Sequence, residues 1–493
     1  MKPIADPAWV RRTEHELHAD PTRVVTMLFL PGQELAAPGL SRSSAVIQRV
    51  MALDEEDVEE TLADIVVSYS SRHGDLLATL DAHADLVAHR LPDSPPVSVD
   101  RRRLIGAYFT QEYSVEAAAL FNPSMVAHPD QSGLAQGVTR FVMSVRAVGE
   151  GHISSVEFRT GTIGDDGEIT VDPVGHTTVR PVVVPTTYSK DGFERQHAEL
   201  GGEQSNSDFV LDALPSTFDR ADLDRALREL RAQRLTRGTG TRTIDRFEWI
   251  ASCHYSIEFP AESTVAQRVV MPRSSSESHG LEDARFARFV EDDGRVEYRA
   301  TYTAFDGSKV VPQLLRTDDF RTFHVSQLSG GGAKNKGMAL FPRKVGGSYL
   351  AVSRADRESN ALTRSDNLSH WHKPTPLQMP AQSWEIVQLG NCGPPIETET
   401  GWLVLTHGVG PMREYGIGAI LLDLEEPSKV IGSLARPMIT AQSDERDGYV
   451  PNVVYSCGGM LHGDTLVVPY GCSDSFIRIA LVDVPSLLDE LHR

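Results

Sequence analysis

The change from helical to strand-like sequence patterns near residue 121 most constrains the fold, because the chain beyond it consists mainly of short candidate strands. The clearest of these strands read "RFVMSVRAV", "HISSVEFRTG", "EITVDPV", "VEYRATYTAF", "SYLAVSRAD", "GWLVLTHGV", "GAILLDL" and "TLVVPYG". Glycine, proline, aspartate and serine separate them, and these residues favour turns. Many short strands with frequent turn signals predict an all-β domain, either a propeller or a sandwich.

Two turns in this region share a pattern that favours a repeat. They read "TDDFRTF" from Thr317 and "SDNLSHW" from Ser365, and each combines a hydroxyl residue, an acid and a closing aromatic. Their separation of about 50 residues matches one four-stranded propeller blade. The strand region would then hold about five blades. A sandwich is the alternative that this pattern leaves open.

In the first 120 residues, the apolar side chains recur at helical spacing instead. Val58, Leu62, Ile65 and Tyr69 recur at helical spacing after an acidic first turn, and a second helical pattern follows Gly74. A third helical pattern runs through "VDRRRLIGAYFTQEYSVEAAAL".

We therefore predict an N-terminal helical extension over residues 1–120 and a strand domain over residues 121–493. Within the strand domain, "STFDRADLDRALRELRAQRL" predicts a helical excursion with Leu223, Leu227 and Leu230 as its apolar stripe.

The charge of the chain limits its partners. A formal net charge of -20 over 493 residues argues against nonspecific binding to nucleic acid and to anionic membranes, because the long-range field would repel both. The four cysteines are too few and too scattered for a disulfide framework, so we expect reduced thiols and a cytoplasmic location. We find no export leader and no apolar segment long enough to span a bilayer.

The segment "SESHGLEDARF" places Glu282, Asp283 and Arg285 at the entrance of an apolar-alternating strand. Strand ends hold side chains rigidly around a cleft. Similar groups lie near the ends of other strands, namely Asn122, Arg146, Lys336, Arg354, Asn391, Glu397, His407, Tyr415 and Asp474. Equivalent strand ends of all blades meet around the channel of a propeller, so these groups can share one pocket.

The cations of this set predict an anion site inside an acidic protein. Arg146, Arg285, Lys336, Arg354 and a protonated His407 would match the oxygens of phosphate. The alternative is that each cation is a solvated charge at a strand end.

The acids predict the chemistry of glycoside cleavage, which ordinarily uses two carboxylates. Only one acid is needed if phosphate attacks the anomeric carbon. Asp283 fits this one-acid scheme, whereas Glu282 and Glu397 keep the two-acid scheme open.

Other motifs are weaker. The loop "SGGGAKNKG" lacks the Gly-Lys-Ser/Thr ending of a Walker loop. Cys253 with His254, and Cys457 with His462, lack a second pair at zinc-ligand spacing. No Gly-x-Ser-x-Gly elbow occurs. The sequence therefore implies no metal and no cofactor.

Several long blocks resemble glycoside hydrolase family 130, the β-mannoside phosphorylases and mannosidases. The blocks are "FNPSMV", "SVRAVGEGHISSVEFRTG", "SHGLEDARF", "KGMALFPRKVGGSYLAVSR", "NCGPPIETETGWLVLTHGVG", "YGIGAILLDLEEPSKVIG" and "GYVPNVVYSCG". The resemblance implies a five-bladed β-propeller with the active site at the mouth of its channel. It also implies that Asp283 is the proton donor and acts through a sugar hydroxyl.

The same resemblance implies the roles of the other residues. Phosphate binding falls on Lys336, Arg354, His407 and Tyr415, and the mannose subsite falls on Asn122, Arg146, Arg285 and Asp474. We add Glu282, Asn391 and Glu397 to the substrate-binding residues. Two positions depart from the pattern: Ala284 replaces a common proline, and Lys336 replaces an arginine of some members.

The helical extension lies outside the shared blocks and resembles that of a longer subgroup similar to β-1,2-mannobiose phosphorylases. It would either cap the pocket or form a contact of a homo-oligomer.

We therefore predict inverting phosphorolysis of terminal β-mannosides, with β-1,2-mannobiose or short β-1,2-mannooligosaccharides as substrates. Inorganic phosphate would be the co-substrate, and α-mannose 1-phosphate the product. Two alternatives stay open: an inverting β-mannosidase that uses water, and a noncatalytic sugar-binding propeller. The expected partners are the mannoside and phosphate, without nucleic acid or membrane.

Overall fold

The structure is a computed structural model and describes residues 6–32, 35–37, 40–91, 97–201, 204–234 and 239–493. The chain forms two compact units. The larger unit takes in the described residues up to Ala19, Ala118–Val174 and Arg180–Arg493, and the smaller one takes in Asp20–Ala117 and Gly175–Val179.

The smaller unit is mainly helical. Its principal elements are β2 (Val24–Leu28), α1 (Arg42–Met51), α2 (Glu55–Tyr69), α3 (Leu76–Val87), α4 (Val99–Tyr108) and β5 (Thr110–Ser114). Helix α2 begins where the Asp54 side chain accepts a hydrogen bond from the Asp57 amide, and three acids in its first turn favour the same start. Its buried residues Val58 and Leu62 belong to the stripe that the sequence predicts.

The third predicted helix is shorter than expected. Helix α4 ends at Tyr108, and the residues after it form β5 and the start of β6. Strand β5 pairs antiparallel with β2, which lies about 80 residues earlier in the chain. A partner at that distance leaves no trace in the local pattern, and its hydrogen bonds override the helical spacing.

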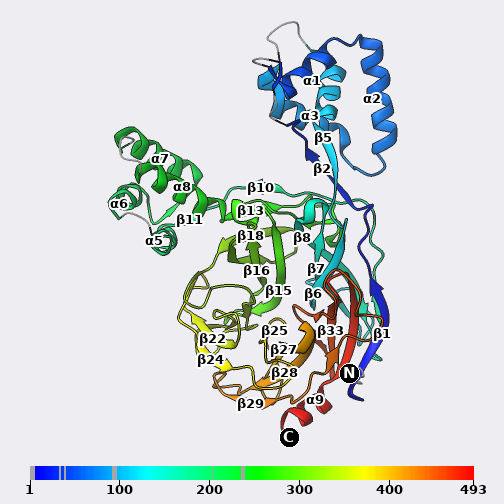
Figure 1. The fold of residues 1–493 in the computed structure, drawn as a ribbon, viewed down its shortest axis with the longest axis vertical. Coiled ribbons are helices and arrows are strands. Elements are labelled where there is room, and N and C mark those ends of the chain that lie inside the picture. Colours follow the sequence, from blue (N-terminus) through cyan, green and yellow to red (C-terminus); the bar gives the residue numbers. More distant parts are fainter. Residues whose placement is uncertain (1–5, 33–34, 38–39, 92–96, 202–203, 235–238) are drawn as a thin grey trace. The chain divides into compact units, whose positions relative to one another are not determined.

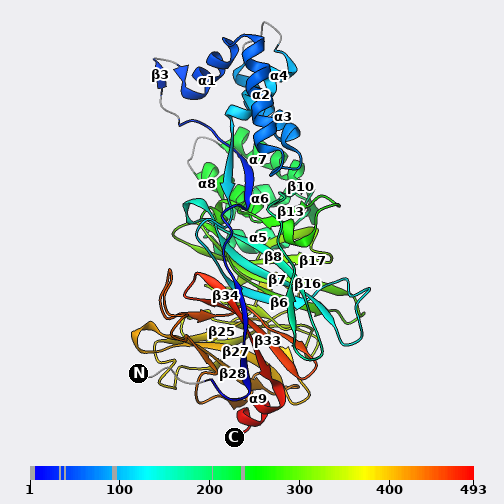
Figure 2. The same cartoon turned by 90° about the vertical axis from the view of Figure 1, so that its right-hand side faces the viewer.

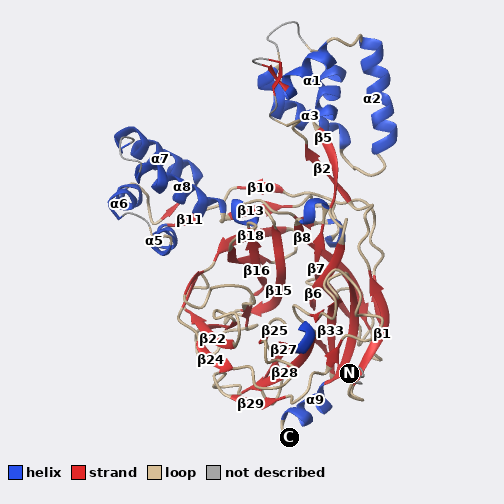
Figure 3. Ribbon diagram, viewed as in Figure 1, coloured by secondary structure: helices blue, strands red, loops and turns tan. Residues whose placement is uncertain are grey.

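The larger unit is built mostly from strands, with some helices (Figure 3). This composition confirms the predominance of strands that we predicted for the region. Hydrogen bonding joins the principal strands into sheets of 11, four, six and five strands, and the 11-stranded sheet contains two antiparallel groups linked by a parallel pairing of Gly280 with Ser154. We count these two groups and the other three sheets as five successive antiparallel groups of strands.

The five groups follow the chain, and in Figure 1 they succeed one another around a common centre. The principal strands of the first group are β6 (Ala119–Ala127), β7 (Thr139–Val148), β8 (Ser154–Ile163) and β9 (Ile169–Val171), and those of the second are β15 (Gly280–Val290), β16 (Val296–Phe305), β17 (Val310–Thr317) and β18 (Thr322–Gln327). The third group contains β20 (Ala339–Leu340), β21 (Tyr349–Ser353), β22 (Asn360–Ser365) and β24 (Thr375–Gln378), and the fourth contains β25 (Gln388–Asn391), β27 (Trp402–Val409), β28 (Tyr415–Leu422) and β29 (Val430–Ser433). The fifth group contains β31 (Val454–Tyr455), β33 (Thr465–Cys472), β34 (Phe476–Asp483) and β1 (Val10–Leu17).

Each group shares an apolar core with the next. Phe158 of the first group contacts Phe286 of the second. Separate clusters of buried residues join the second group to the third, the third to the fourth, and the fourth to the fifth. A further cluster joins the fifth group back to the first and includes Phe141 and Ile479. The packing therefore runs once around the ring.

The last group takes its outer strand from the start of the chain. Strand β1 pairs antiparallel with β34, and Figures 1 and 2 show the two running side by side. Arg12 of β1 reaches the buried carboxylate of Glu445 and the Tyr470 hydroxyl, the latter at 3.0 Å. Residues 6–19 thus belong to the larger unit, whereas the sequence assigned them to the helical extension.

The two similar turns occupy the same place in successive groups, each directly after the third strand. Asp319 and Asn367 each accept hydrogen bonds from backbone amides of their own turn. The next residues, Phe320 and Leu368, both adopt positive φ, 57° and 64°. The shared pattern in the sequence therefore corresponds to a shared backbone conformation.

The predicted helical excursion is part of a larger insertion. It contains α5 (Lys190–Glu199), α6 (Gln204–Asp212), α7 (Arg220–Arg234) and α8 (Thr239–Ser252). The stripe Leu223, Leu227 and Leu230 is buried in a core of the insertion, together with Phe193 and Phe247. None of the described helices has the length and apolar character needed to cross a membrane.

Candidate active site

One cavity of the larger unit gathers most of the residues selected from the sequence. Its volume is about 220 Å³. It is lined by Asn122, Arg146, Asp283, Lys336, Arg354, Gln388, His407, Arg413, Tyr415, Val450, Val453, Tyr455 and Asp474. These residues come from all five groups of strands.

Strained backbone positions aim three polar side chains at the cavity. Asn122, Asp283 and Asp474 have positive φ values of 49°, 57° and 52°. The ladder between β6 and β7 shifts register at Asn122, and the ladder between β15 and β16 shifts at Asp283. Such bulges re-aim side chains, and a positive φ costs a residue other than glycine about 1–3 kcal/mol. Strain of this kind clusters at functional sites.

Asp283 is surrounded by donors. Its Oδ1 accepts hydrogen bonds from Asn122 Nδ2 at 2.7 Å and from Arg146 Nη1 at 3.2 Å. Burial alone would raise the pKa of Asp283, but the charges of Arg146, Arg285 and Lys336 and the Asn122 hydrogen bond lower it to about 2. Asp283 is therefore a carboxylate at neutral pH in this arrangement.

Glu282 forms a second carboxylate beside the cavity without lining it. Its Oε1 accepts from Arg146 Nη2 at 2.8 Å, and its Oε2 is paired with Lys336. Glu282 is 6% exposed, and the side chain of Arg146 is less exposed than that of Lys336, 19% against 40%, so solvent screens the pair with Arg146 less than the pair with Lys336. Glu282 and Asp283 thus share Arg146, while Lys336 links Glu282 to the phosphate side predicted from the sequence.

Arg354, His407 and Tyr415 also line the cavity. Arg354 Nη1 donates to His407 Nε2 at 3.1 Å, and His407 Nδ1 donates to the Asn391 carbonyl at 3.2 Å. Burial and the charges of Arg354 and Arg285 hold the pKa of His407 well below its usual value. His407 is therefore neutral, and the prediction of a protonated His407 is wrong, because two guanidinium groups already lie near the ring.

Several donors around the cavity lack partners. Among the described residues, the Nε atoms of Arg146 and Arg354, which line the cavity, are buried without a hydrogen bond, as is the Nε atom of Arg285, which does not line it. Buried polar groups are ordinarily paired, so unpaired guanidinium donors at a cavity fit an oxyanion ligand.

Arg285 and Asn391 support the site from behind. Arg285 donates to the Asp283 carbonyl at 2.9 Å and to the Tyr455 hydroxyl at 2.7 Å. The Asn391 side chain donates to the Gly337 carbonyl at 2.6 Å. Neither residue lines the cavity, and both hold residues that do.

Glu397 does not join the site. Its carboxylate pairs with Arg343, and both side chains are 41% exposed. Strand β26 (Ile396–Glu397) pairs with Trp402 and Leu403 at the start of β27, whereas His407 lies near the end of that strand. The sequence could not separate the two because Glu397 and His407 belong to one continuous block.

Sequence reasoning missed three polar lining residues, Gln388, Arg413 and Tyr455. Tyr455 stands in the block "GYVPNVVYSCG", but a tyrosine in a short strand carries no signal of a cavity. Arg413 is the last residue of a short 3-10 helix (Pro411–Arg413) and has a positive φ of 58°, and only the fold brings it near Asp474.

Asp474 differs from Asp283 in its ionisation. Burial, reinforced by the charge of Asp283, raises the pKa of Asp474 from 3.8 to about 6 although Arg146 and Arg413 oppose the shift. Two carboxyl groups in one cavity therefore have widely different pKa values, which is a recurring property of catalytic pairs.

We expect Asp474→Asn to stabilise the protein above pH 6. A carboxyl whose pKa is higher in the folded state than in the unfolded chain weakens folding once it ionises. The free energy of unfolding of the variant should exceed that of wild type by about 2–3 kcal/mol at pH 8 and by nearly nothing below about pH 4. Urea unfolding across this range checks the difference, with Asp447→Asn at an exposed neighbouring position as control. An equal difference at both pH values would contradict the shifted ionisation.

A strand domain with paired carboxylates and anion-binding cations in one cavity has the groups expected of a carbohydrate-active protein. Comparison with known proteins narrows this class of carbohydrate-active protein to one family. The model of glycoside hydrolase family 130, described as β-1,4-mannooligosaccharide phosphorylase, matches residues 250–493. The chain belongs to this family of mannoside phosphorylases.

Individual relatives cover different parts of the chain. A 1,2-β-oligomannan phosphorylase of Thermoanaerobacter sp. (strain X514) is 37% identical over 155 residues, which are 31% of this chain and 52% of the relative. A β-1,2-mannobiose phosphorylase of the same organism is 29% identical over 245 residues, 48% of this chain and 79% of the relative. The chain thus spans about half the length of the first relative.

A solved structure is also similar. The β-1,2-mannobiose phosphorylase from Listeria innocua, in complex with β-1,2-mannobiose, superposes with a TM-score of 0.45 at 19% identity. The match covers 77% of this chain and 93% of that structure.

Proposed function

We propose that this chain catalyses inverting phosphorolysis of terminal β-mannosides on a five-bladed β-propeller. The proposal rests on one observation: Asp283 lines the same cavity as Lys336 and Arg354. A carboxyl group and an oxyanion-binding pair in one cavity can act on the two faces of one glycosidic bond. The propeller is supported by the packing that runs once around the five groups of strands.

In the proposed reaction, a phosphate oxygen forms a bond to the anomeric carbon as the bond to the acceptor oxygen breaks. Attack from the face opposite the leaving group converts the β-mannoside into α-mannose 1-phosphate. The acceptor oxygen takes a proton from Asp283, relayed through a sugar hydroxyl, and Asp283 regains a proton from monohydrogen phosphate. Lys336, Arg354, His407 and Tyr415 hold the phosphate.

Bound phosphate would also raise the low pKa of Asp283, which otherwise prevents this carboxyl group from carrying a proton. The negative charge of phosphate offsets the nearby positive charges that keep Asp283 ionised. Its pKa then rises, and the carboxyl can hold the proton that the leaving oxygen needs. Nε2 of neutral His407 is a hydrogen-bond acceptor, so in place of Arg354 it can accept a hydrogen bond from the P–OH group of monohydrogen phosphate.

The substrate class follows from the relatives. Two of them are described as acting on β-1,2-linked mannosides, so we propose β-1,2-mannobiose or short β-1,2-mannooligosaccharides for this chain. Asn122, Arg146 and Asp474 would bind the terminal mannose, since they line the cavity around Asp283.

Omission of phosphate tests the proposal. Purified protein is incubated with β-1,2-mannobiose with and without inorganic phosphate, and α-mannose 1-phosphate and free mannose are quantified. We expect turnover only with phosphate, giving the sugar phosphate and mannose in equal amounts. Turnover that continues without phosphate would instead establish a β-mannosidase, and binding without turnover in either arm would establish a sugar-binding protein.

A further inference from the structure

A second, larger cavity meets the candidate active site at the residues that hold phosphate in the proposed reaction. Its volume is about 1090 Å³, and Lys336, Arg354 and Gln388 line both cavities. Lys336 and Arg354 are phosphate-binding residues of the proposal. Asp283 and Asp474, by contrast, line the smaller cavity and not the larger one. The larger cavity therefore opens onto the phosphate position and not onto the sugar.

The helical insertion forms one wall of this cavity. Helix α5 supplies Glu199, and α8 supplies Arg246. Other parts of the wall come from the turn before β17 and from the loop before β20, with Lys309 and Lys334.

Hydrogen bonds fix the insertion to the strand groups. Gln196 of α5 donates to the Gln327 carbonyl at 3.2 Å, and Glu199 accepts from the Gly330 amide at 2.8 Å. The wall that the insertion provides is thus held in place beside the strands.

The larger cavity has an excess of positive charge within an acidic protein. Its lining contains three carboxylates and six cationic side chains, namely Arg246, Lys309, Lys334, Lys336, Arg354 and Arg357. The chain as a whole has a formal net charge of -20, so its overall field repels an anion such as phosphate. A local surface lined by cations can reverse this repulsion and raise the rate at which an anion arrives.

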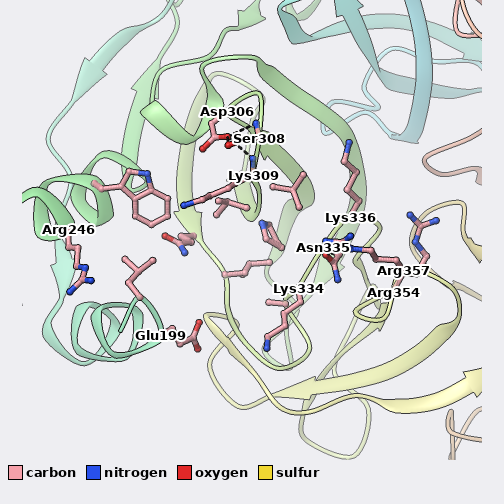
Figure 4. A pocket seen from close by; sticks show the side chains of 18 of the residues that line it. Glu199, Arg246, Asp306, Ser308, Lys309, Lys334, Asn335, Lys336, Arg354 and Arg357 are labelled. Atoms are coloured by element: carbon pink, nitrogen blue, oxygen red, sulfur yellow. Dashed lines mark hydrogen bonds between the residues drawn. The ribbon is translucent and has the colours of Figure 1, made fainter. Parts of the chain in front are cut away.

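The cations are spread across the cavity. In Figure 4, Arg246 lies on one side, Lys336 and Arg354 lie on the other, and Lys309 and Lys334 lie between them. Lys309 and Lys334 are exposed and form no ion pair with any residue in the described part of the chain, whereas Lys336 and Arg354 are partly buried. Cations arranged in this way suit the passage of an anion from solvent to the buried end better than they suit one fixed binding site.

We propose that the larger cavity is the route by which inorganic phosphate reaches Lys336 and Arg354, and that Lys309 and Lys334 steer it inward. This inference rests on the proposed function, because that function identifies phosphate as the anion and the two inner cations as its binding residues. A mannoside bound at Asp283 occupies the smaller cavity, so a separate route lets phosphate enter after the sugar has bound.

Removal of the two outer charges tests the steering. In Lys309→Gln/Lys334→Gln, kcat/KM for phosphate at saturating mannobiose should fall by about 5-fold at an ionic strength of about 10 mM, where exposed charges act over a long distance. The fall should disappear at about 0.5 M NaCl, because salt then screens charges that do not touch the ligand. Both kcat and the kcat/KM for mannobiose at saturating phosphate should stay at their wild-type values.

A matched control removes the same net charge elsewhere. Arg228→Gln/Arg231→Gln changes two exposed residues of α7 that do not line the cavity, and kcat/KM for phosphate should stay at its wild-type value. An equal fall in this control would assign the effect to net charge and overturn the inference. An unchanged kcat/KM in the lysine variant, or a fall that persists at high salt as for a direct contact, would also overturn it.

Obstruction of the cavity tests the route itself. The four cysteines of the chain are buried, so Ser308→Cys places an exposed thiol in the lining of the larger cavity. Coupling of a bulky uncharged maleimide to this thiol should lower kcat/KM for phosphate several-fold and leave kcat/KM for mannobiose at saturating phosphate unchanged. Ala232→Cys, an exposed position on α7 outside the cavity lining, is the labelled control. An unchanged kcat/KM for phosphate after labelling of Ser308→Cys would contradict the route.

Calorimetric titration with inorganic phosphate separates this inference from the proposed function. If wild type does not turn over mannobiose with phosphate, the proposed function fails, and phosphate binding still decides about the cavity. Weaker binding to Lys309→Gln/Lys334→Gln than to wild type at low salt, with equal binding at high salt, supports the steering. Absent binding to wild type, or equal binding to both proteins at low salt, contradicts it.

Discussion

Asp283→Asn should lower kcat for phosphorolysis of β-1,2-mannobiose by roughly 10³-fold, the middle of the range for loss of a general acid. An asparagine cannot deliver the proton that the leaving oxygen needs. The substitution is otherwise conservative, since asparagine tolerates the positive φ of 57° at this position and keeps an oxygen for the Asn122 hydrogen bond. Initial rates with saturating phosphate and mannobiose measure the loss, and circular dichroism checks the fold.

Glu397→Gln is the matched control for this prediction. Glu397 lies in an exposed pair with Arg343, and a surface pair of this kind contributes about 0–1 kcal/mol to folding. We expect its kcat to equal that of wild type. A Glu397 variant as impaired as Asp283→Asn would restore the two-acid scheme, and near-normal activity of Asp283→Asn would remove Asp283 from the mechanism.

Arg354→Ala should raise the KM for phosphate by about 10- to 100-fold, because hydrogen bonds to charged groups contribute about 1.5–3 kcal/mol. Arg354 lines the cavity, donates to neutral His407 and has a buried Nε without a partner. Its loss removes both a charge and a fork of donors. Phosphate saturation curves at fixed, saturating mannobiose give the KM.

Arg354→Lys refines the test. Lysine restores the charge as a single point but not the planar fork, so its KM for phosphate should lie between those of wild type and Arg354→Ala. Mannobiose binding in the absence of phosphate should change little in both variants. An unchanged phosphate KM in Arg354→Ala would mean that phosphate is held elsewhere.

Local patterns predicted much of the architecture. The repeated turns at Thr317 and Ser365 indicated a structural repeat, and the structure gives both the same place and the same backbone conformation. The helical spacing around Val58 and Leu223 likewise identified buried stripes. Patterns with a period of a few residues report on the local backbone, and these elements obey it.

Predictions that depended on distant partners were less complete. The segment after Tyr108 looked helical, yet β2 recruits it as a strand. The start of the chain looked like part of the helical extension, yet β1 completes the last group of strands through Arg12 and Glu445. In both cases the partner is far away in the sequence, so no local signal could reveal it.

By itself, the sequence determined the strand-rich class of the larger unit, the family to which the chain belongs and most of the polar residues of the candidate site. Only the tertiary structure decided their electrical state: a low pKa for Asp283, a high one for Asp474 and a neutral His407. It also separated Glu397 from the site and made the helical insertion one wall of a cationic cavity. The physical reason is that burial and neighbouring charge set ionisation and access, and both arise from residues that folding brings together across the whole chain.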